Sequence, residues 1–355
     1  MKNQNKKRYQ KKNKLKKVRI FSNNLKKEKE KYKSKKYQKL YYSNKSKSSI
    51  INYLLLFFTI FIIILLFILL FRKYKKNKNK CKSKTKVGLC IICKRENLYI
   101  KEFVDYYRNL GYNHIFIYDN GDPGDETYDN VIKENINNGF VSLIDYRNEK
   151  NGQIFKAYED CYEKNNKNYD WLSFFDIDEY LVLKPDNVCI QEFLDNERYK
   201  DCQNIKFNWL IYTDDDKLHY ENKPVQERFL TPNYNCTWFN QHVKSSVRGN
   251  LSTNYWTKAN TPHASDHECI ACSSSGNQTD KGSPFINPPD YTNAILKHYR
   301  TKTVEEYCNK MKKGKPDRQI DYREMINWFF DTNKVTQEKI DIFKKEFNIE
   351  FHYKK

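Results

Sequence analysis

The stretch FFDIDEY, residues 174–180, places Asp176, Asp178 and Glu179 directly behind large apolar side chains. Burying an unpaired carboxylate is costly, so these acids need water, a cation or another partner. Alternate side chains of an extended chain point the same way, which lets Asp176 and Asp178 face one point. Two such carboxylates repel unless a cation lies between them, and hard divalent cations complete their shell with water or phosphate oxygens. The spacing predicts a divalent metal site for a diphosphate; the alternative is a strand end with solvated acids.

These acids depend for their position on a chain that alternates predicted strands with predicted helices. Apolar runs predict buried strands, and in the first predicted helix the apolar residues recur at helical spacing before Gly111 ends it. The predicted strands span 87–93, 114–120, 140–146, 171–180 and 205–212, and the predicted helices span 98–111, 153–166, 303–311 and 321–347. This alternation predicts an α/β fold with a mostly parallel sheet flanked by helices.

Polar residues follow three of these predicted strands, at Lys94–Glu96, Asp119–Asn120 and Asp176–Asp178. In open parallel sheets, ligands bind outside the carboxyl ends of the strands. We therefore expect the three clusters to meet at one edge of the sheet and to form one site there.

Several stretches of the chain, taken in order, match the blocks of one known family. CIICKRENLYIKEFVDYYRNLGYNHIFIYDN contains Lys94 and Glu96, with Arg95 where that family usually has Asn. FFDIDEYLVL, ERFL, KSSVR and ILKHYRTKTVEEYCNKMKKG follow it. Together these motifs resemble glycosyltransferase family 92, formerly called domain of unknown function 23, over roughly residues 87–315.

The resemblance implies a GT-A, Rossmann-like fold, a nucleotide-sugar donor and a divalent metal, usually Mn²⁺, with Mg²⁺ as the alternative. It also implies inversion at the anomeric carbon, often with galactose moved from UDP-galactose to a glycan acceptor. Members are commonly anchored in the Golgi membrane with a lumenal catalytic domain. The chain departs from the family after Trp209, where IYTDDDKL replaces a Gly- and Ser-containing turn. That departure leaves the sugar and acceptor specificity open.

The resemblance also implies a role for each candidate site residue. Asp176 and Asp178 would hold the metal on the diphosphate, with His298 preferred over His263 as a third ligand because it lies in a matching block. Lys94, Glu96 and Asn120 would border the nucleotide pocket, and Asp119 would contact the uridine or ribose. Phosphate oxygens would be met by Lys244, Arg248 and Arg300. The base that takes the acceptor proton is expected among Asp214, Asp215 and Asp216, which follow a predicted strand. The alternatives are ordinary surface pairing for the three basic residues, a solvated acidic loop for the three aspartates, and a structural role for a lone histidine.

The N-terminal part of the chain differs from the rest in charge and hydropathy. Residues 1–49 carry 20 Lys and Arg against two acids, and residues 72–86 carry nine without an acid. We expect a disordered basic tail over 1–49 and a basic stem over 72–86, before a transferase domain over 87–350. Residues 50–71 contain no charged residue and are long enough for a single transmembrane helix. Basic flanks on both sides leave the orientation open from charge alone, and the resemblance favours a type II protein of the Golgi.

Charge and cysteine usage bound the remaining possibilities. The positive charge lies in the tails and the rest of the chain is mildly acidic, so the composition does not indicate a nucleic-acid partner.

Ten cysteines agree with an oxidising compartment. Cys90 and Cys93 fall on opposite faces of a predicted strand, which favours core packing over a redox pair. In HASDHECIAC the spacing is irregular for zinc, and we expect disulfides at Cys269 and Cys272. Asn-x-Ser/Thr acceptors, in weak agreement with a lumenal domain, occur at Asn235, Asn250 and Asn277.

Two other function classes compete with a transferase. FFDIDEYL also resembles the first motif of haloacid-dehalogenase phosphatases, although that motif normally lies on the first strand and precedes a small residue pair. A non-catalytic membrane protein that binds lipid through its basic tails is the third hypothesis. It predicts that the acidic cluster binds neither metal nor nucleotide.

Overall fold

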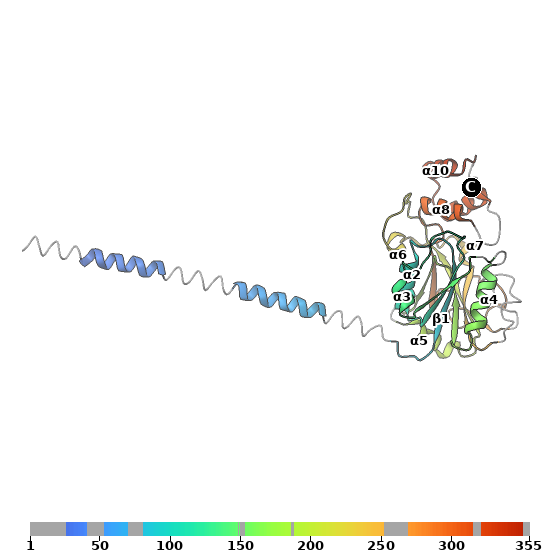
Figure 1. Ribbon diagram of the computed structural model, residues 1–355, viewed down its shortest axis with the longest axis horizontal. Helices are drawn as coiled ribbons and strands as arrows, with labels where there is room; N and C mark the ends of the chain where they lie inside the picture. Colours follow the sequence, from blue (N-terminus) through green and yellow to red (C-terminus); the bar gives the residue numbers. More distant parts are fainter. Residues whose placement is uncertain are drawn as a thin grey trace, which may run out of the picture. The chain divides into compact units, whose positions relative to one another are not determined.

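The computed structural model describes residues 26–40, 53–69, 81–147, 149, 153–185, 188–251, 269–314 and 321–350. The chain forms two compact units, Met1–Lys78 and Asn79–Lys355 (Figure 1). In the first unit, residues 26–40 and 53–69 are helical and exposed. Within the described ranges, we find no helix that combines the length and the apolar character needed to span a bilayer. Residues 50–52 and 70–71 of the predicted membrane span lie outside those ranges.

The second unit is built on one nine-stranded sheet. Its strands are β1 (Val87–Cys93), β2 (His114–Asp119), β3 (Val141–Asp145), β4 (Trp171–Phe174), β5 (Glu179–Leu183), β6 (Asn204–Ile211), β7 (Val243–Arg248), β8 (Ala271–Cys272) and β9 (Ala294–His298). Its helices are α2 (Ile100–Leu110), α3 (Lys133–Asn137), α4 (Gln153–Asn165), α5 (Ile190–Leu194), the 3-10 turn η1 (Glu197–Tyr199), α6 (Val225–Arg228), α7 (Thr237–Asn240), α8 (Val304–Lys313), α9 (Tyr322–Phe330) and α10 (Gln337–Phe347).

The α/β class is as predicted, but the sheet is mixed rather than mostly parallel. Its order is β3-β2-β1-β4-β7-β6-β9-β5, with β8 beside β6. The first four strands are parallel, whereas β7 runs antiparallel to β4 and β6, and β5 runs antiparallel to β9. The connections that precede β5 and β7 do not cross back over the sheet. Each of these strands therefore starts at the edge where β4 or β6 has just ended, and runs in the opposite direction.

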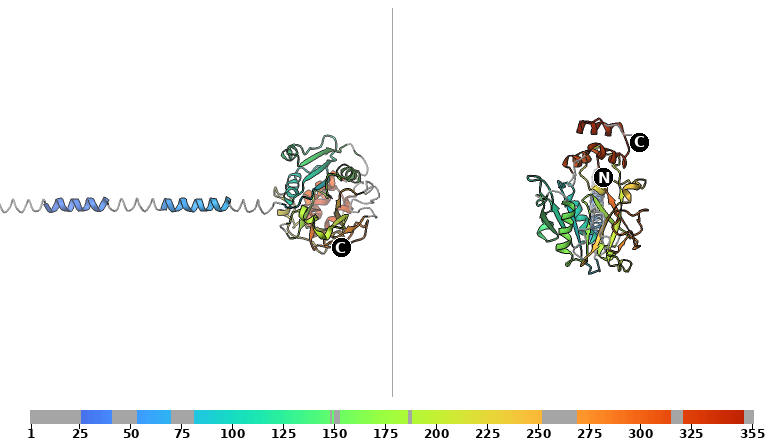
Figure 2. Two further views of the ribbon diagram at one scale, coloured as in Figure 1. Left: turned by 90° about the horizontal axis from the view of Figure 1, so that it is seen from below. Right: turned by 90° about the vertical axis from the view of Figure 1, so that its right-hand side faces the viewer.

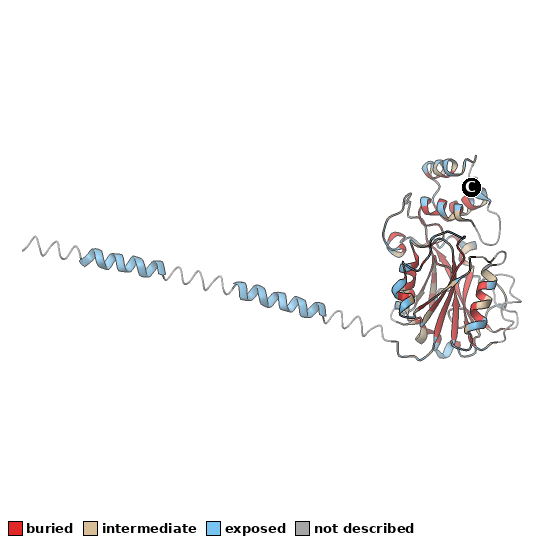
Figure 3. Ribbon diagram, in the orientation of Figure 1, coloured by how far each residue is buried: buried red, intermediate tan, exposed pale blue. Residues whose placement is uncertain are grey.

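Helices cover both faces of the parallel half of the sheet. Leu89, Ile91 and Cys93 of β1 share a buried cluster with the apolar side of α2, as its helical spacing predicted. Cys90 and Ile92 belong to a second cluster with α4. Figure 1 shows α2 and α3 on one side of the sheet and α4 on the other. In Figure 3 the buried residues concentrate in the strands and on the inward sides of these helices.

Three helices lie beyond the carboxyl edge of the parallel strands. The predicted helix over 321–347 is two helices, α9 and α10, which pack with α8 around Tyr307, Phe329 and Phe343. Figure 2 shows this orange-to-red group past one end of the sheet. The edge at which the sequence predicts a site therefore has a roof that contributes its own side chains.

Disulfides join the sheet to its surroundings. Cys90 bonds to Cys161 of α4, so its predicted plain packing is replaced by a covalent link, while Cys93 is a buried thiol on the opposite face. Cys272 bonds to Cys202, which confirms one of the two predicted disulfide cysteines, and Cys269 is a buried thiol instead. His263, the less favoured metal ligand, lies outside the described residues.

Candidate active site

The two candidate metal-binding aspartates project from a tight turn. β4 ends at Phe174, and the backbone N–H of Asp176 donates to Glu179 Oε2 at 2.8 Å. The N–H of Glu179 in turn donates to the carbonyl of Asp176 at 3.0 Å. This local cap interrupts the strand predicted over 171–180. The aspartates still reach the predicted edge, but they do not share one face of a strand.

Asp178 is nearly buried and faces two different partners. Its Oδ2 lies 2.8 Å from Lys310 Nζ, and its Oδ1 lies 3.4 Å from His298 Nε2. Burial alone would raise the pKa of Asp178, but Lys310 and His298 outweigh burial and hold the pKa well below its usual value. Burial lowers the pKa of His298 despite its contact with Asp178. At neutral pH the pair therefore consists of a carboxylate and a neutral imidazole.

Asp176 belongs to a separate charge cluster with Lys244. Lys244 Nζ lies 2.8 Å from Asp176 Oδ1 and 3.9 Å from Glu179 Oε1. Burial opposes the charge on Lys244, but Asp176 and Glu179 outweigh burial and raise its pKa. Glu179 is fully buried, and burial raises its pKa far above the usual value. Lys244 is thus at the predicted edge, where it neutralises Asp176.

The end of β1 meets the last turn of α8. Lys94 Nζ lies 2.8 Å from Asp122 Oδ2, and Lys313 Nζ donates to the carbonyl of Lys94 at 3.1 Å. Lys313 also pairs with Glu96, which is buried. Lys94 and Glu96, the two candidate site residues after β1, are therefore tied to charged partners at the carboxyl edge.

Two cavities meet around Asp178. One, of about 180 Å³, lies over the ends of β1, β2 and β4 and brings together four of the predicted residues, Lys94, Glu96, Asn120 and Asp176, beside Asp178. The other, of about 290 Å³, lies towards α8 and includes Lys302. Both are also lined by Glu96, Asp178, Lys310 and Lys313. Shared walls make them two parts of one hollow.

Asp119 reaches the same edge but has a structural partner. Its Oδ2 accepts from Arg147 Nη2 at 2.6 Å, and its Oδ1 accepts from the Gly121 N–H at 3.0 Å. Arg147 also donates to three carbonyl oxygens of the loop 122–126. Asp119 therefore shapes the loop beside Asn120, and neither of the two cavities is lined by it.

The two predicted arginines are not brought to the cavities. Arg248 pairs in register with Trp171 at the start of β4, because β7 runs antiparallel to β4 and ends at the opposite edge of the sheet. Arg300 lies near the carboxyl edge, but its guanidinium stands over the rings of Phe239 and Trp328, at 4.2 and 5.0 Å. Strand direction and aromatic contacts thus remove both from the set that converges around Asp178.

The three predicted base candidates join the loop after β6 to the C-terminal helices. Asp214 is buried, with its Oδ2 at 2.7 Å from Lys339 Nζ of α10. Asp216 Oδ1 lies 2.9 Å from the same ammonium, and Asp215 Oδ2 accepts from the Leu230 N–H at 2.6 Å. None of the three lines either cavity. A role as base stays a prediction, and these contacts give each carboxylate a structural role.

Three charged residues that the sequence analysis did not assign lie on one side of α8. Glu306, Lys310 and Lys313 follow each other at i, i+4 and i+7, which places them along one helical face. Glu306 forms a two-bond ion pair with Arg228, at 2.7 and 2.9 Å, and accepts from Tyr99 at 2.6 Å. This buried anchor holds Lys310 and Lys313 over the site. Their spacing was the signal that could have identified them.

The donor atoms near Asp178 fit a divalent cation whose coordination shell is completed by phosphate oxygens. Within the described ranges, no three His, Cys, Asp or Glu side chains converge as a ligand set. Asp178 and His298 supply one oxygen and one nitrogen donor, and His298 Nδ1 is buried without a hydrogen-bond partner. Small divalent cations are commonly held by one or two carboxylates plus waters and substrate phosphates. The residues fit that kind of site, in which Lys310 would have to yield its contact with Asp178.

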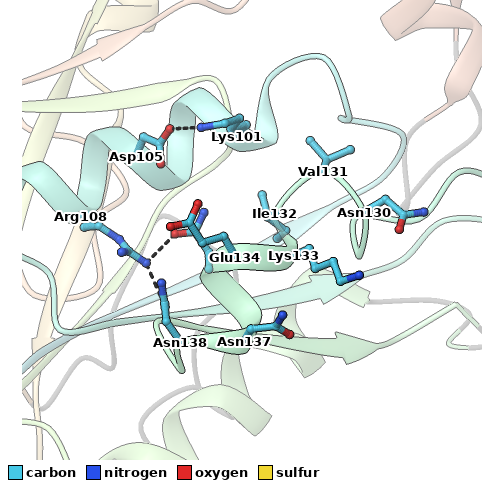
Figure 4. A pocket seen from close by; sticks show the side chains of 11 residues that line it. Lys101, Asp105, Arg108, Asn130, Val131, Ile132, Lys133, Glu134, Asn137 and Asn138 are labelled. Carbon is cyan, nitrogen blue, oxygen red and sulfur yellow. Dashed lines mark hydrogen bonds and ion pairs between the residues drawn. The ribbon is translucent and has the colours of Figure 1, made fainter.

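A larger hollow of about 680 Å³ lies elsewhere, between α2 and α3 (Figure 4). Three of its charged side chains contact neighbours: Lys101 pairs with Asp105, and Arg108 donates to Asn138 at 3.1 Å. None of the candidate site residues lines it. Size alone therefore does not mark the site.

The family model of glycosyltransferase family 92 matches residues 86–350 of the chain. The chain belongs to glycosyltransferase family 92. Membership of family 92 makes the protein a glycosyltransferase and removes the phosphatase and the non-catalytic alternatives. The matched region begins one residue before β1 and includes the roof helices α8, α9 and α10.

No curated protein matches this member of family 92. Among solved structures, it is similar to S. aureus TarS 1–349 in complex with UDP, with 12% identity, a TM-score of 0.26 and coverage of 39% of this chain and 38% of that one. S. aureus TarS gives 10% identity, a TM-score of 0.31 and coverage of 74% and 49%. Another structure of S. aureus TarS 1–349 gives 12% identity, a TM-score of 0.30 and coverage of 74% of this chain and 71% of that one. The chain thus spans less than half of the first two, and these scores support no inference about function.

Proposed function

We propose that this family 92 enzyme transfers a sugar, with galactose from UDP-galactose as the first candidate, to a glycan acceptor at the hollow around Asp178. The observation that carries the proposal is the meeting of Asp178, Lys94, Asn120 and the α8 lysines around two joined cavities at the carboxyl edge of the sheet. The choice of UDP-galactose rests on the sequence resemblance to the family. The GT-A type of the fold rests on the same resemblance.

The proposed reaction breaks the bond between the anomeric carbon and the distal phosphate oxygen, and the electron pair stays on that oxygen. The acceptor oxygen attacks from the opposite side, which inverts the anomeric carbon, and its proton passes to a base. Mn²⁺ or Mg²⁺ held by Asp178 and His298 would supply charge neutralisation on the diphosphate. Lys310 and Lys313 would add positive charge at the same oxygens.

We place the acceptor on the side of α7. Asn120 and Lys94 lie over β2 and β1 on one side of Asp178, whereas α7 lies over the other half of the sheet, next to the start of β7. Trp238 of α7 is 60% exposed, and its ring contacts His242 and Phe285 at centroid distances of 5.6 and 5.4 Å. An exposed aromatic ring held rigidly by other rings can stack on the apolar face of a sugar.

We further propose that residues 50–71 anchor the enzyme as a type II protein of the Golgi. The absence of charge over this stretch and the family resemblance support the anchor. The three disulfides of the described domain agree with an oxidising lumen.

An assay of nucleoside diphosphate release tests the proposal. The full-length protein is given a panel of UDP-, GDP- and other nucleotide sugars, with and without Mn²⁺ and with and without a mixture of glycan acceptors. We expect acceptor-dependent release of UDP from UDP-galactose that requires the metal. Acceptor-dependent release from a different sugar would correct the donor alone. No release from any of them, by protein shown to be folded, would refute the proposed activity.

A further inference from the structure

Lys302 is a buried lysine that has no acidic partner of its own among the described residues. Its residue is 7% exposed, between the end of β9 and the start of α8. Its Nζ stands 4.2 Å from the centre of the Tyr99 ring. No hydrogen bond or ion pair joins this side chain to any described residue. Since a buried charge normally needs a partner, this arrangement is costly unless a ligand completes it.

The local backbone holds Lys302 in this position. Its φ is +54°, in the left-handed region that side chains other than glycine seldom adopt. The next residue, Thr303, caps α8 together with Glu306 in a two-way capping box. Strained conformations of this kind persist where the surrounding structure fixes them, and they cluster at binding sites.

The charges around the cavity leave Lys302 as the one described cation of its wall without an acidic partner. Of the acids in the wall, Asp178 pairs with Lys310, Glu96 pairs with Lys313, and Glu306 pairs with Arg228. The other two basic residues of the wall also have acids of their own, namely Asp125 for Arg95 and Glu346 for Lys312. The cavity of about 290 Å³ therefore presents an excess of positive charge at Lys302.

We infer that Lys302 binds the distal phosphate of a nucleoside diphosphate, with Lys310 and Lys313 beside it, and so stabilises the leaving group of the transfer. This rests on the proposed function, which it deepens by naming the phosphate subsite. The nucleoside then lies in the adjoining cavity of about 180 Å³ beside Asn120 and Lys94. When the bond to the anomeric carbon breaks, the electron pair and the added negative charge stay on the distal phosphate, against the ammonium of Lys302.

A diphosphate suits this position for chemical reasons. Ammonium groups are compact point charges that bind phosphate oxygens from several directions. The two cavities share Lys310 and Lys313, so a ligand with two linked phosphates can pass from one cavity into the other. A single carboxylate would reach Lys302 but would leave this shared wall uncontacted.

The test is isothermal titration of the full-length protein with UDP, UMP, uridine and inorganic pyrophosphate, each with and without Mn²⁺. We expect Lys302→Met to weaken UDP and pyrophosphate binding about tenfold to hundredfold, the range for a hydrogen bond to a charged group. Uridine binding should not change, and UMP binding should change less than UDP binding. Lys302→Arg keeps the charge and should retain the binding of UDP.

Lys297→Met is the matched control. Lys297 also stands over a tyrosine ring, at 5.2 Å from that of Tyr212, but it does not line either cavity. It should bind UDP like the wild type. The midpoint temperature of unfolding of K302M should equal or exceed that of the wild type, because methionine removes a buried charge and keeps the same backbone. If K302M does not fold, K302Q takes its place in the same titrations.

The outcomes separate the subsite from the proposed activity. Unchanged UDP and pyrophosphate affinity in folded K302M would overturn the subsite while leaving the transferase proposal intact. Loss of pyrophosphate binding in K302M, in a protein that prefers a nucleotide other than UDP, would support the subsite and correct the donor. Wild-type protein that binds neither pyrophosphate nor any nucleoside diphosphate would overturn both.

Discussion

The buried pair of Arg228 and Glu306 decides whether α8 can hold its lysines over the site. The side chains are 1% and 3% exposed and share two hydrogen bonds. Replacing Arg228 by methionine leaves Glu306 buried without its counter-ion. Removing one partner of a buried ion pair costs about 3–5 kcal/mol. We therefore expect Arg228→Met to destabilise the domain by roughly 4 kcal/mol and to weaken UDP binding.

The titration of Glu306 gives an independent measure of the same interaction. Burial would raise the pKa of Glu306, but Arg228 and Tyr99 outweigh burial and lower it from 4.5 to about 2. This difference corresponds to about 3 kcal/mol of stabilisation. Because the pKa is lower in the folded protein, the stabilisation is complete above pH 4.5 and is lost as the pH falls towards 2. The loss on acidification should be absent from Glu306→Gln.

A double-mutant cycle measured by urea unfolding checks both free energies, the cost of losing Arg228 and the stabilisation inferred from the pKa of Glu306. Glu306→Gln keeps one side-chain oxygen that can accept from the Thr303 N–H in the capping box, removes the charge and replaces the second acceptor oxygen with an NH2 donor. We expect each single variant to lose several kcal/mol and to unfold roughly 10 °C lower, and the double variant R228M/E306Q to recover much of the loss. A cost below about 1 kcal/mol for R228M, or a double variant equal to the sum of the singles, would refute this reasoning.

Three further predictions concern the site and its frame. Asp178→Asn should lower metal-dependent transfer by at least about tenfold while the protein stays folded, measured by UDP release and circular dichroism; full activity would remove Asp178 from the metal site. Replacing Cys202 and Cys272 together by serine should cost about 4 kcal/mol in urea unfolding, since the bond closes a loop of 70 residues, and a loss under 1 kcal/mol would contradict this. Trp238→Ala should raise KM for the acceptor about two- to tenfold and leave hydrolysis of the donor unchanged; an unchanged acceptor KM would move the acceptor away from α7.

Local patterns in the sequence were enough to predict the parallel half of the fold. Ile100, Phe103, Val104 and Tyr107 are the buried residues of α2, and Gly111 ends that helix at a φ of +100°. These features depend on neighbours within a few residues, where periodicity and backbone preference act. The carboxyl-edge rule then located Lys94, Asn120 and Asp178 correctly beside one hollow.

Interactions between distant parts of the chain explain what the sequence did not reveal. The position of Arg248 follows from the direction of β7, which no local pattern specifies. Asp214 is paired with Lys339, more than a hundred residues away, so its burial was not visible in the acidic run that contains it. The strand after Trp171 stops because the Glu179 side chain binds the Asp176 N–H, and alternation of apolar residues carries no sign of that cap.

The disulfide between Cys81 and Cys189 fixes where the chain enters the transferase domain. Cys189 precedes α5, beside Gly111 at the end of α2, and Figure 1 shows α5 at the far end of the sheet from α8. The entry point and the hollow around Asp178 thus lie at opposite poles of the domain. If the protein is immobilised through a tag placed just before Cys81, the hollow around Asp178 should stay accessible. Bulky glycan-bearing molecules could then be offered to it on a solid support.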